Sequence, residues 1–149
     1  MDLEAICTRL SGLGIKVLRN QTVLEDGVQF IGIDDADART QVASQLPALE
    51  PAANALRILL YHRPDGAEAA ASWGVHLMLC GHTHNGQIMP FNWLVKRQFA
   101  RIKGLYSVAG LYLYVSPGTG TWGPVMRLGT TCEITHLQIE PIPAATPAE

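Results

Sequence analysis

A short apolar run that leads into two histidines constrains this chain more than any other stretch. Residues 75–80 are apolar apart from His76 and have the length of a buried strand, and Gly81 then precedes His82, Thr83 and His84. Because glycine relaxes the backbone just past the strand, the two imidazoles can turn toward neighbouring metal ions. Taken alone, the pair fits a surface feature as well as it fits metal ligands.

A second apolar run, residues 57–61, also ends in a histidine, His62. In open α/β sheets, sites form outside the carboxyl ends of parallel strands, so two strands that each end in a histidine predict one shared site. We therefore expect His62, His82 and His84 to converge on one pocket and to act as metal ligands.

Length, charge and cysteine content fit one soluble domain. The chain has 149 residues and a formal net charge of −2, so it lacks the basic surplus of a nucleic-acid-binding protein. Cys7, Cys80 and Cys132 are widely spaced and form no CxxC pair, which predicts unpaired thiols. The amino terminus does not follow the plan of a signal peptide, so the chain as written is expected to be soluble.

Apolar spacing predicts two helices in the first third of the chain. One covers residues 3–13, with Asp2 as its cap, and the other covers residues 36–46, where we assign Asp35 to the N-cap rather than to a metal. A third helix, residues 67–73, follows Asp65 in a box-like start.

Strand patterns lie between and after these helices. The expected strands are residues 15–18, 28–33, 57–61, 75–80 and 133–139, with a hairpin inside 106–116 that turns at Ala109 and Gly110. Strand, helix and strand over residues 57–80 form a βαβ-like unit, which places the chain in the α/β class. Residues 141–149 are rich in Pro and Ala and are expected to be a disordered tail after a domain of residues 1–140.

Two further stretches have competing interpretations. The cations of residues 96–103 lie among apolar residues, so they fit a solvated basic helix face, or contact with an anionic substrate or lipid headgroups. Residues 118–123 match G-x-G-x-x-G, but Pro124 follows where a dinucleotide fold needs a helix. We reject that fold and expect a loop that borders the site.

The segment Gly81-His82-Thr83-His84-Asn85-Gly86-Gln87, with residues 116–124 and Arg127, resembles the calcineurin-like metallophosphoesterase superfamily. The likeness is to its bacterial, often membrane-associated phosphodiesterase branch, and it covers residues 3–140. It implies part of an αββα sandwich, with mixed sheets flanked by helices and the amino-terminal half missing. The family's Asp-x-His, Gly-Asp and Gly-Asn-His motifs are not found, and Asn85 replaces a common glycine.

The resemblance also implies roles for single residues. His62 and His82 would bind one divalent ion and His84 the other, with Mn, Fe, Zn and Mg all open as the metal. Two such ions polarise a phosphoryl group and activate a water for its hydrolysis. Asn85, Gln87 and Arg127 would lie next to the phosphoester substrate, and no catalytic residue is assigned.

The missing motifs lead to an expectation of impaired activity. Three neutral imidazoles do not offset the repulsion between two divalent ions, so this chain alone is expected to hold one ion weakly or none. We therefore hypothesise a truncated reading frame with an exposed sheet edge that favours self-association, and possible membrane-surface association as in full-length relatives. The alternatives are a non-catalytic metal- or partner-binding remnant and a cupin, which the helical stripes disfavour.

Overall fold

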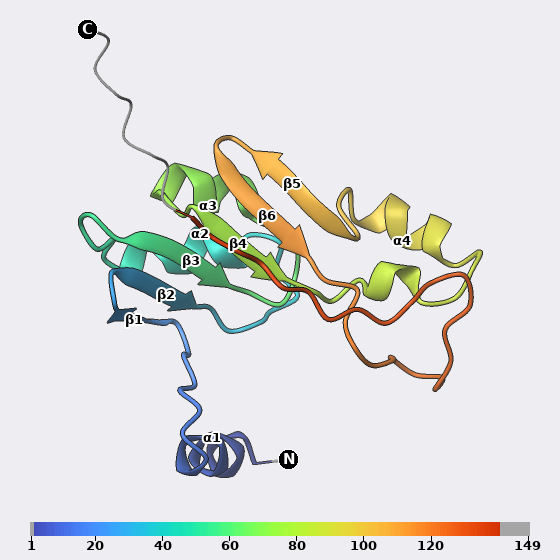
Figure 1. The fold of residues 1–149 in the computed structure, drawn as a ribbon, viewed down its shortest axis with the longest axis horizontal. Coiled ribbons are helices and arrows are strands. Elements are labelled where there is room, and N and C mark those ends of the chain that lie inside the picture. The colour runs from blue at the N-terminus through green and yellow to red at the C-terminus, as the bar shows by residue number, and fades with distance from the viewer. Residues whose placement is uncertain (1, 141–149) are drawn as a thin grey trace, which may run out of the picture.

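Six strands form one mixed sheet in the computed structural model, which describes residues 2–140 (Figure 1). The strands are β1 Gln21–Glu25, β2 Val28–Gly32, β3 Leu56–Leu60, β4 Leu77–Cys80, β5 Gly104–Val108 and β6 Leu111–Val115. Their order across the sheet is β1-β2-β3-β4-β6-β5, with the four inner strands parallel and the two edge strands antiparallel to their neighbours. The expected α/β class with a mixed sheet is confirmed.

One face of the sheet carries the core. Fully buried side chains lie in register across the parallel strands, namely Ile31, Leu59, Met78 and Leu113. Two helices, α2 Gln41–Gln45 and α3 Ala67–Trp73, pack against each other and join this cluster through Val42, Ala67 and Ala70. The alternation of strand side chains therefore places apolar residues under helices, as in α/β proteins generally.

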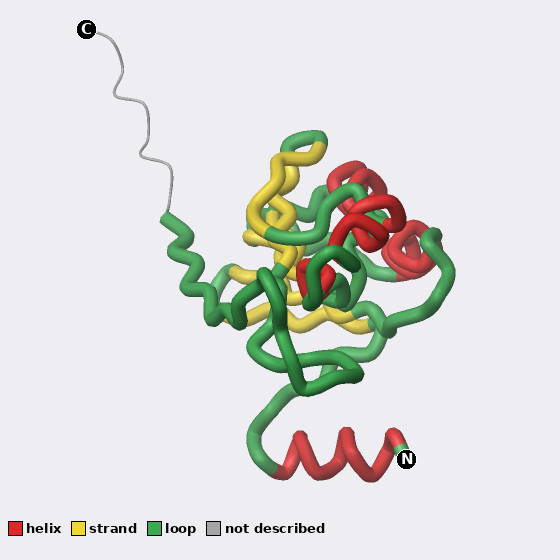
Figure 2. Tube along the Cα trace, turned by 90° about the vertical axis from the view of Figure 1, so that its right-hand side faces the viewer, coloured by secondary structure: helices red, strands yellow, loops and turns green. Residues whose placement is uncertain are grey.

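Helix α1, Leu3–Gly12, stands apart from the sheet in Figure 2. The Asp2 carboxylate accepts hydrogen bonds from the amides of Glu4 and Ala5, so the predicted cap is confirmed. None of the residues of α1 is buried. Within residues 2–140, no helix has the length and apolar character needed to cross a membrane.

The first expected strand, residues 15–18, is wrong. The strand that pairs with β2 is β1, which begins at Gln21. Asp26 and Gly27 both have positive φ, 48° and 78°, and form a two-residue turn that joins β1 directly to β2. Such a turn requires the partner strand to end immediately before it, which moves the strand past residues 15–18.

The expected caps of α2 and α3 are also wrong. Helix α2 begins after Thr40, and Asp35 lies outside it because its carboxylate accepts hydrogen bonds from Arg63. Gly66, not Asp65, precedes α3, and Glu68 pairs with Arg101 instead of closing a capping box. The carboxylates of Asp35 and Glu68, which the local sequence pattern assigned to helix starts, instead form ion pairs with residues distant in the sequence. The remaining helical turns are η1 Leu46–Ala48, η2 His84–Gly86 and α4 Asn92–Gln98.

The last expected strand, residues 133–139, is irregular in the structure. This segment, red in Figure 1, runs along the sheet face opposite α2 and α3. The hydroxyl of Tyr114, on β6, contacts the side chains of Glu133 and Thr135. These side-chain contacts, with one backbone bond from the amide of Glu133 to the carbonyl of Gly118, hold the segment in place of a strand ladder. The hairpin at Ala109 and Gly110 and three free cysteines are as expected, and the predicted tail, 141–149, lies outside the described residues.

Candidate metal centre

His62 and His82 meet at the carboxyl ends of two adjacent parallel strands. Leu60 on β3 lies opposite Leu79 on β4, and beyond this pair the amide of Gly81 donates to the carbonyl of His62 at 3.0 Å. The Nδ1 atom of His82 then lies 3.1 Å from Nε2 of His62, with the rings edge to face and their centroids 4.9 Å apart. The prediction that these strands bring two imidazoles together is confirmed.

His84 reaches the same cavity from η2. Its Nδ1 atom is buried and has no hydrogen-bond partner among the described residues. Burial, together with the positive charge of Arg127, lowers the pKa of His84, and burial together with Arg63 lowers that of His82. Both shifts favour the neutral imidazole, which is the form that coordinates a metal.

The backbone around these histidines is held in a conformation that residues other than glycine rarely adopt. The φ angles are 67° at His82, 48° at His84, 52° at Asn85 and 50° at Gln87. Left-handed residues of this kind cost free energy and persist where the surrounding structure enforces them. Their concentration in one six-residue turn is typical of a functional site.

The three imidazoles line an open cavity of about 690 Å³. Its other wall is apolar and comes from Phe91, Val95 and Phe99 around α4. The ring of Phe99 packs edge-on against His82, with centroids 5.3 Å apart. The cavity therefore has nitrogen donors on one wall and apolar side chains on the other.

Asp35 and Arg63 also line the cavity, and sequence reasoning missed both. Arg63 donates from Nε and Nη2 to the Asp35 carboxylate, at 2.8 and 3.2 Å, and from Nη2 to Asp37 at 2.6 Å. Burial alone would raise the pKa of Asp35, but its bonds with Arg63 lower it, so the carboxylate stays charged. Arg63 directly follows His62 at the end of a strand, and this position could have identified Arg63 as a residue of the site.

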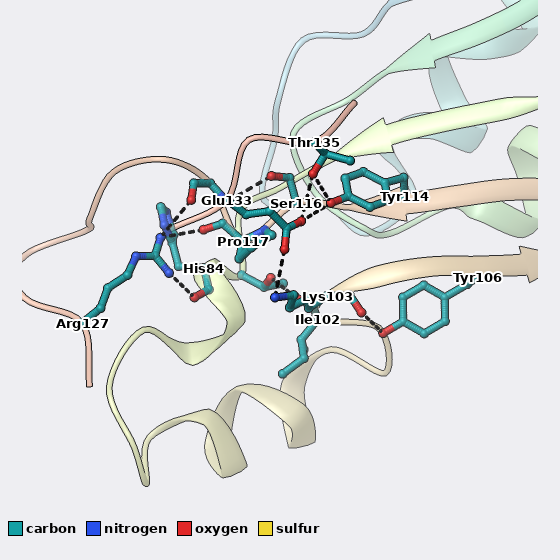
Figure 3. A network of polar contacts seen from close by, with 12 residues as sticks. His84, Ile102, Lys103, Tyr106, Tyr114, Ser116, Pro117, Arg127, Glu133 and Thr135 are labelled. Atoms are coloured by element: carbon teal, nitrogen blue, oxygen red, sulfur yellow. Dashed lines mark hydrogen bonds and ion pairs between the residues drawn. The ribbon is translucent and has the colours of Figure 1, made fainter. Parts of the chain in front are cut away.

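Gln87 and Arg127 join the histidine turn to the loop of residues 116–128. The amide of the buried Gln87 bonds with the backbone of Trp122 and Pro124. In Figure 3, Arg127 reaches the backbone around His84 and Pro117, where it donates to their carbonyls at 3.1 and 2.7 Å. No helix opens at the end of the G-x-G-x-x-G stretch, as expected.

These contacts bear on the predicted substrate neighbours. Of the three, Gln87 lines the cavity, whereas Asn85 and Arg127 are not among its lining residues. Arg127 uses its guanidinium to hold backbone carbonyls. A direct role of Asn85, Gln87 and Arg127 toward a substrate stays a prediction.

The donors present fit part of a metal coordination shell. Two nitrogens that are each about 2.1 Å from one ion lie roughly 3.0–3.4 Å apart at coordination angles of about 90–109°. The 3.1 Å separation of the His62 and His82 nitrogens falls in this range. Within residues 2–140, however, no three His, Cys, Asp or Glu side chains are grouped so that they could hold one ion. The described residues thus offer two paired donors and one unpartnered imidazole.

Similarity to known proteins agrees with this geometry. The chain is 34% identical to an uncharacterised metallophosphoesterase of Helicobacter pylori strain J99, over 93% of this chain and 39% of the relative. It is 36% identical to the bovine transmembrane protein with metallophosphoesterase domain, over 90% of this chain and 34% of the relative. It is 35% identical to the phosphodiesterase YaeI of Escherichia coli K12, over 87% of this chain and 49% of the relative.

The chain thus spans between about a third and a half of the length of these relatives. No family model matches the chain, and no solved structure does. The similarity nevertheless extends over most of this chain in each case and includes the histidine turn and its supporting strands. Over most of its length, the chain is therefore similar to proteins named as metallophosphoesterases.

Proposed function

We propose that this chain carries the histidine part of a metal-dependent site that hydrolyses phosphodiesters or phosphomonoesters. The observation that carries the proposal is the 3.1 Å approach of His62 Nε2 and His82 Nδ1 at adjacent strand ends. The unpartnered Nδ1 of His84 in the same cavity adds a third donor. The Escherichia coli relative is named a phosphodiesterase, which favours diesters as the first substrates to test.

His62 and His82 would hold one divalent ion and His84 a second. When bound, such ions supply Lewis acidity and a water of lowered pKa at the phosphoryl group. Imidazole nitrogens suit Zn²⁺ and Fe²⁺ better than Mg²⁺ and Mn²⁺, although all four metals stay candidates. Which ion serves is a question for reconstitution.

The residues around the histidines would position them and the substrate. Phe99 fixes the ring of His82 by edge-on packing, and the hydroxyl of Thr83 anchors the turn by donating to the carbonyl of Ile102 at 2.7 Å. Arg63 is the only Lys or Arg among the described residues that line the cavity, but its guanidinium already bonds with Asp35 and Asp37, so it would hold the segment after His62 in place rather than bind the phosphoryl group.

We expect hydrolysis by this chain alone to be weak. Asp35 is the only carboxylate among the described residues that line the cavity, and Arg63 already binds it. With no free carboxylate there, two divalent ions would repel each other strongly. A non-catalytic metal-binding role is the second candidate, favoured by the lack of a three-ligand group within residues 2–140. Self-association through β1 or β5, the edge strands, stays a prediction.

Hydrolysis of bis-p-nitrophenyl phosphate with added Mn²⁺ tests the proposal. We expect slow, metal-dependent release of nitrophenol that His82→Ala abolishes and that His136→Ala, an exposed histidine outside the cavity, leaves unchanged. Metal binding without hydrolysis would favour the non-catalytic role. Equal hydrolysis by His82→Ala and the wild-type chain would contradict the assignment of the site.

A further inference from the structure

An exposed apolar surface lies beside the cavity, around α4. Its members, which we call the α4 patch, are Met89, Phe91, Trp93 and Leu94, with exposed fractions of 43%, 50%, 66% and 56%. Phe91, Trp93 and Leu94, with Pro90 and Arg97, line a shallow groove of about 570 Å³. Large apolar side chains gathered in this way usually mark a contact surface.

The charged side chains of α4 and of its flanking residues are all positive. Between Glu68 and Glu133 the sequence contains no Asp or Glu. These two carboxylates pair with Arg101 and Lys103. Lys96 and Arg97, on α4 itself, are exposed and make no ion pair with any residue in the described range. Two uncompensated cations therefore stand next to the aromatic side chains.

The α4 patch is continuous with the mouth of the histidine cavity. Phe91 lines both the groove and the cavity. Val95 and Phe99, from the same segment, line the cavity together with the histidines. Trp122, on the neighbouring loop, lines the cavity and is itself largely exposed. Whatever covers the α4 patch would therefore lie at the entrance to the cavity.

We propose that the α4 patch docks on an anionic lipid bilayer. Trp and Phe side chains favour the interface between headgroups and acyl chains, Leu inserts below it, and Lys and Arg bind anionic headgroups. The α4 patch, together with the adjacent Lys96 and Arg97, combines all of these on one short helix and its preceding loop, with no acidic side chain among them. This complementarity in both polarity and charge favours a bilayer over a protein partner, whose surface would have to match the cations with carboxylates.

Docking in this way would turn the cavity mouth toward the headgroup layer. Phosphoesters carried by membrane lipids would then be the substrates nearest to the histidines. This consequence rests on the proposed function, whereas the docking itself does not.

Co-sedimentation of the full chain with vesicles tests the docking. We expect at least tenfold stronger binding to vesicles of phosphatidylcholine with phosphatidylglycerol than to phosphatidylcholine alone, with a decrease at high salt. Trp93→Ser with Leu94→Ser, and separately Lys96→Glu with Arg97→Glu, should each lower binding at least tenfold. Ile134→Ser, which changes a side chain that is 91% exposed, and Arg9→Glu, on α1, are matched controls that should bind normally.

Absence of binding to the anionic vesicles at low salt would overturn the inference, as would equal binding by the α4 variants. A soluble protein that protects the patch in place of vesicles would also overturn it. Because Trp93 and Leu94 do not line the histidine cavity, their variant should hydrolyse a soluble nitrophenyl ester like the wild-type chain. Loss of docking and loss of hydrolysis are therefore separate outcomes.

Discussion

Asp35 and Arg63 form a two-pronged ion pair at the rim of the histidine cavity, with Arg63 Nε 2.8 Å from Asp35 Oδ1. The pair joins the connection after β2 to the residue that follows His62. It therefore ties the histidine of β3 to its neighbouring loop.

Asp35→Asn should weaken that tie. We expect a loss of no more than about 1 kcal/mol in the free energy of unfolding, because the pair is only partly buried. Asp37→Asn is the matched control, since that carboxylate also accepts from Arg63 but is 97% exposed, and it should cost less than about 0.5 kcal/mol. Urea unfolding of both variants measures the difference, and equal losses would contradict a special role for Asp35.

Gly86 lets η2 and α4 pack closely, and Gly86→Ala should disrupt this contact. An added Cβ would lie 2.3 Å from Cα of Asn92, and φ at this position is +72°. Backbone strain and overpacking together predict a loss of about 2 kcal/mol or more. Gly120→Ala meets nothing within 4 Å and should change stability little. Urea unfolding measures both variants. If their unfolding curves coincide, the close approach of Gly86 to Asn92 does not matter for stability.

Arg127→Lys should loosen the loop of residues 116–128. The guanidinium donates to carbonyls of His84, Pro117 and Gly120, a set that a single ammonium group does not reach. We expect faster chymotrypsin cleavage after the exposed Trp122, detected by mass spectrometry. Arg9→Lys is the control and should leave the cleavage rate as in the wild-type chain. An unchanged rate in Arg127→Lys would mean that other contacts, such as those of Gln87, hold the loop alone.

Glu133 should make stability depend on pH in the acid range. The Tyr114 hydroxyl, then Lys103 and Thr135, lower the pKa of Glu133 to about 2 from the usual 4.5 (Figure 3). A lowered pKa in the folded state means that the contribution to stability is complete above about pH 4.5 and is lost as the pH falls toward 2. Glu133→Gln should therefore be less stable than the wild-type chain at pH 7.

Urea unfolding over pH 2–7 measures this effect. The gap between the wild-type chain and Glu133→Gln should narrow as the pH falls toward 2, because Glu133 then becomes protonated and loses its charge. Glu50→Gln removes an exposed carboxylate outside this contact and should run parallel to the wild-type chain. A constant gap between wild type and Glu133→Gln at every pH would contradict the role of the charge.

The sequence predicted the parts of the molecule that depend on local pattern and strand order. The apolar runs before His62 and His82 became β3 and β4, because continuous apolar segments of this length are buried in parallel sheets. Their adjacency then brought the two imidazoles together. Asp2 capped α1 as expected, since no distant residue competes for its carboxylate.

The parts that the sequence did not predict depend on contacts between distant residues. Asp35 was expected to cap a helix but pairs with Arg63, which lies on another loop. Glu133 was expected in a strand but lies in an irregular segment, where it bonds with Tyr114. A single sequence pattern contains no signal for such pairings. The cavity wall from Phe91 and Phe99 was likewise invisible, because α4 folds back over the histidine turn only in three dimensions.

Titration of the full chain with Co²⁺, followed by the visible absorption of the bound ion, tests the central claim that the paired imidazoles hold a metal. We predict saturable binding that His62→Ala and His82→Ala each weaken at least tenfold, while His136→Ala binds like the wild-type chain. Binding that survives both substitutions, or no binding by the wild-type chain at neutral pH, would contradict the claim.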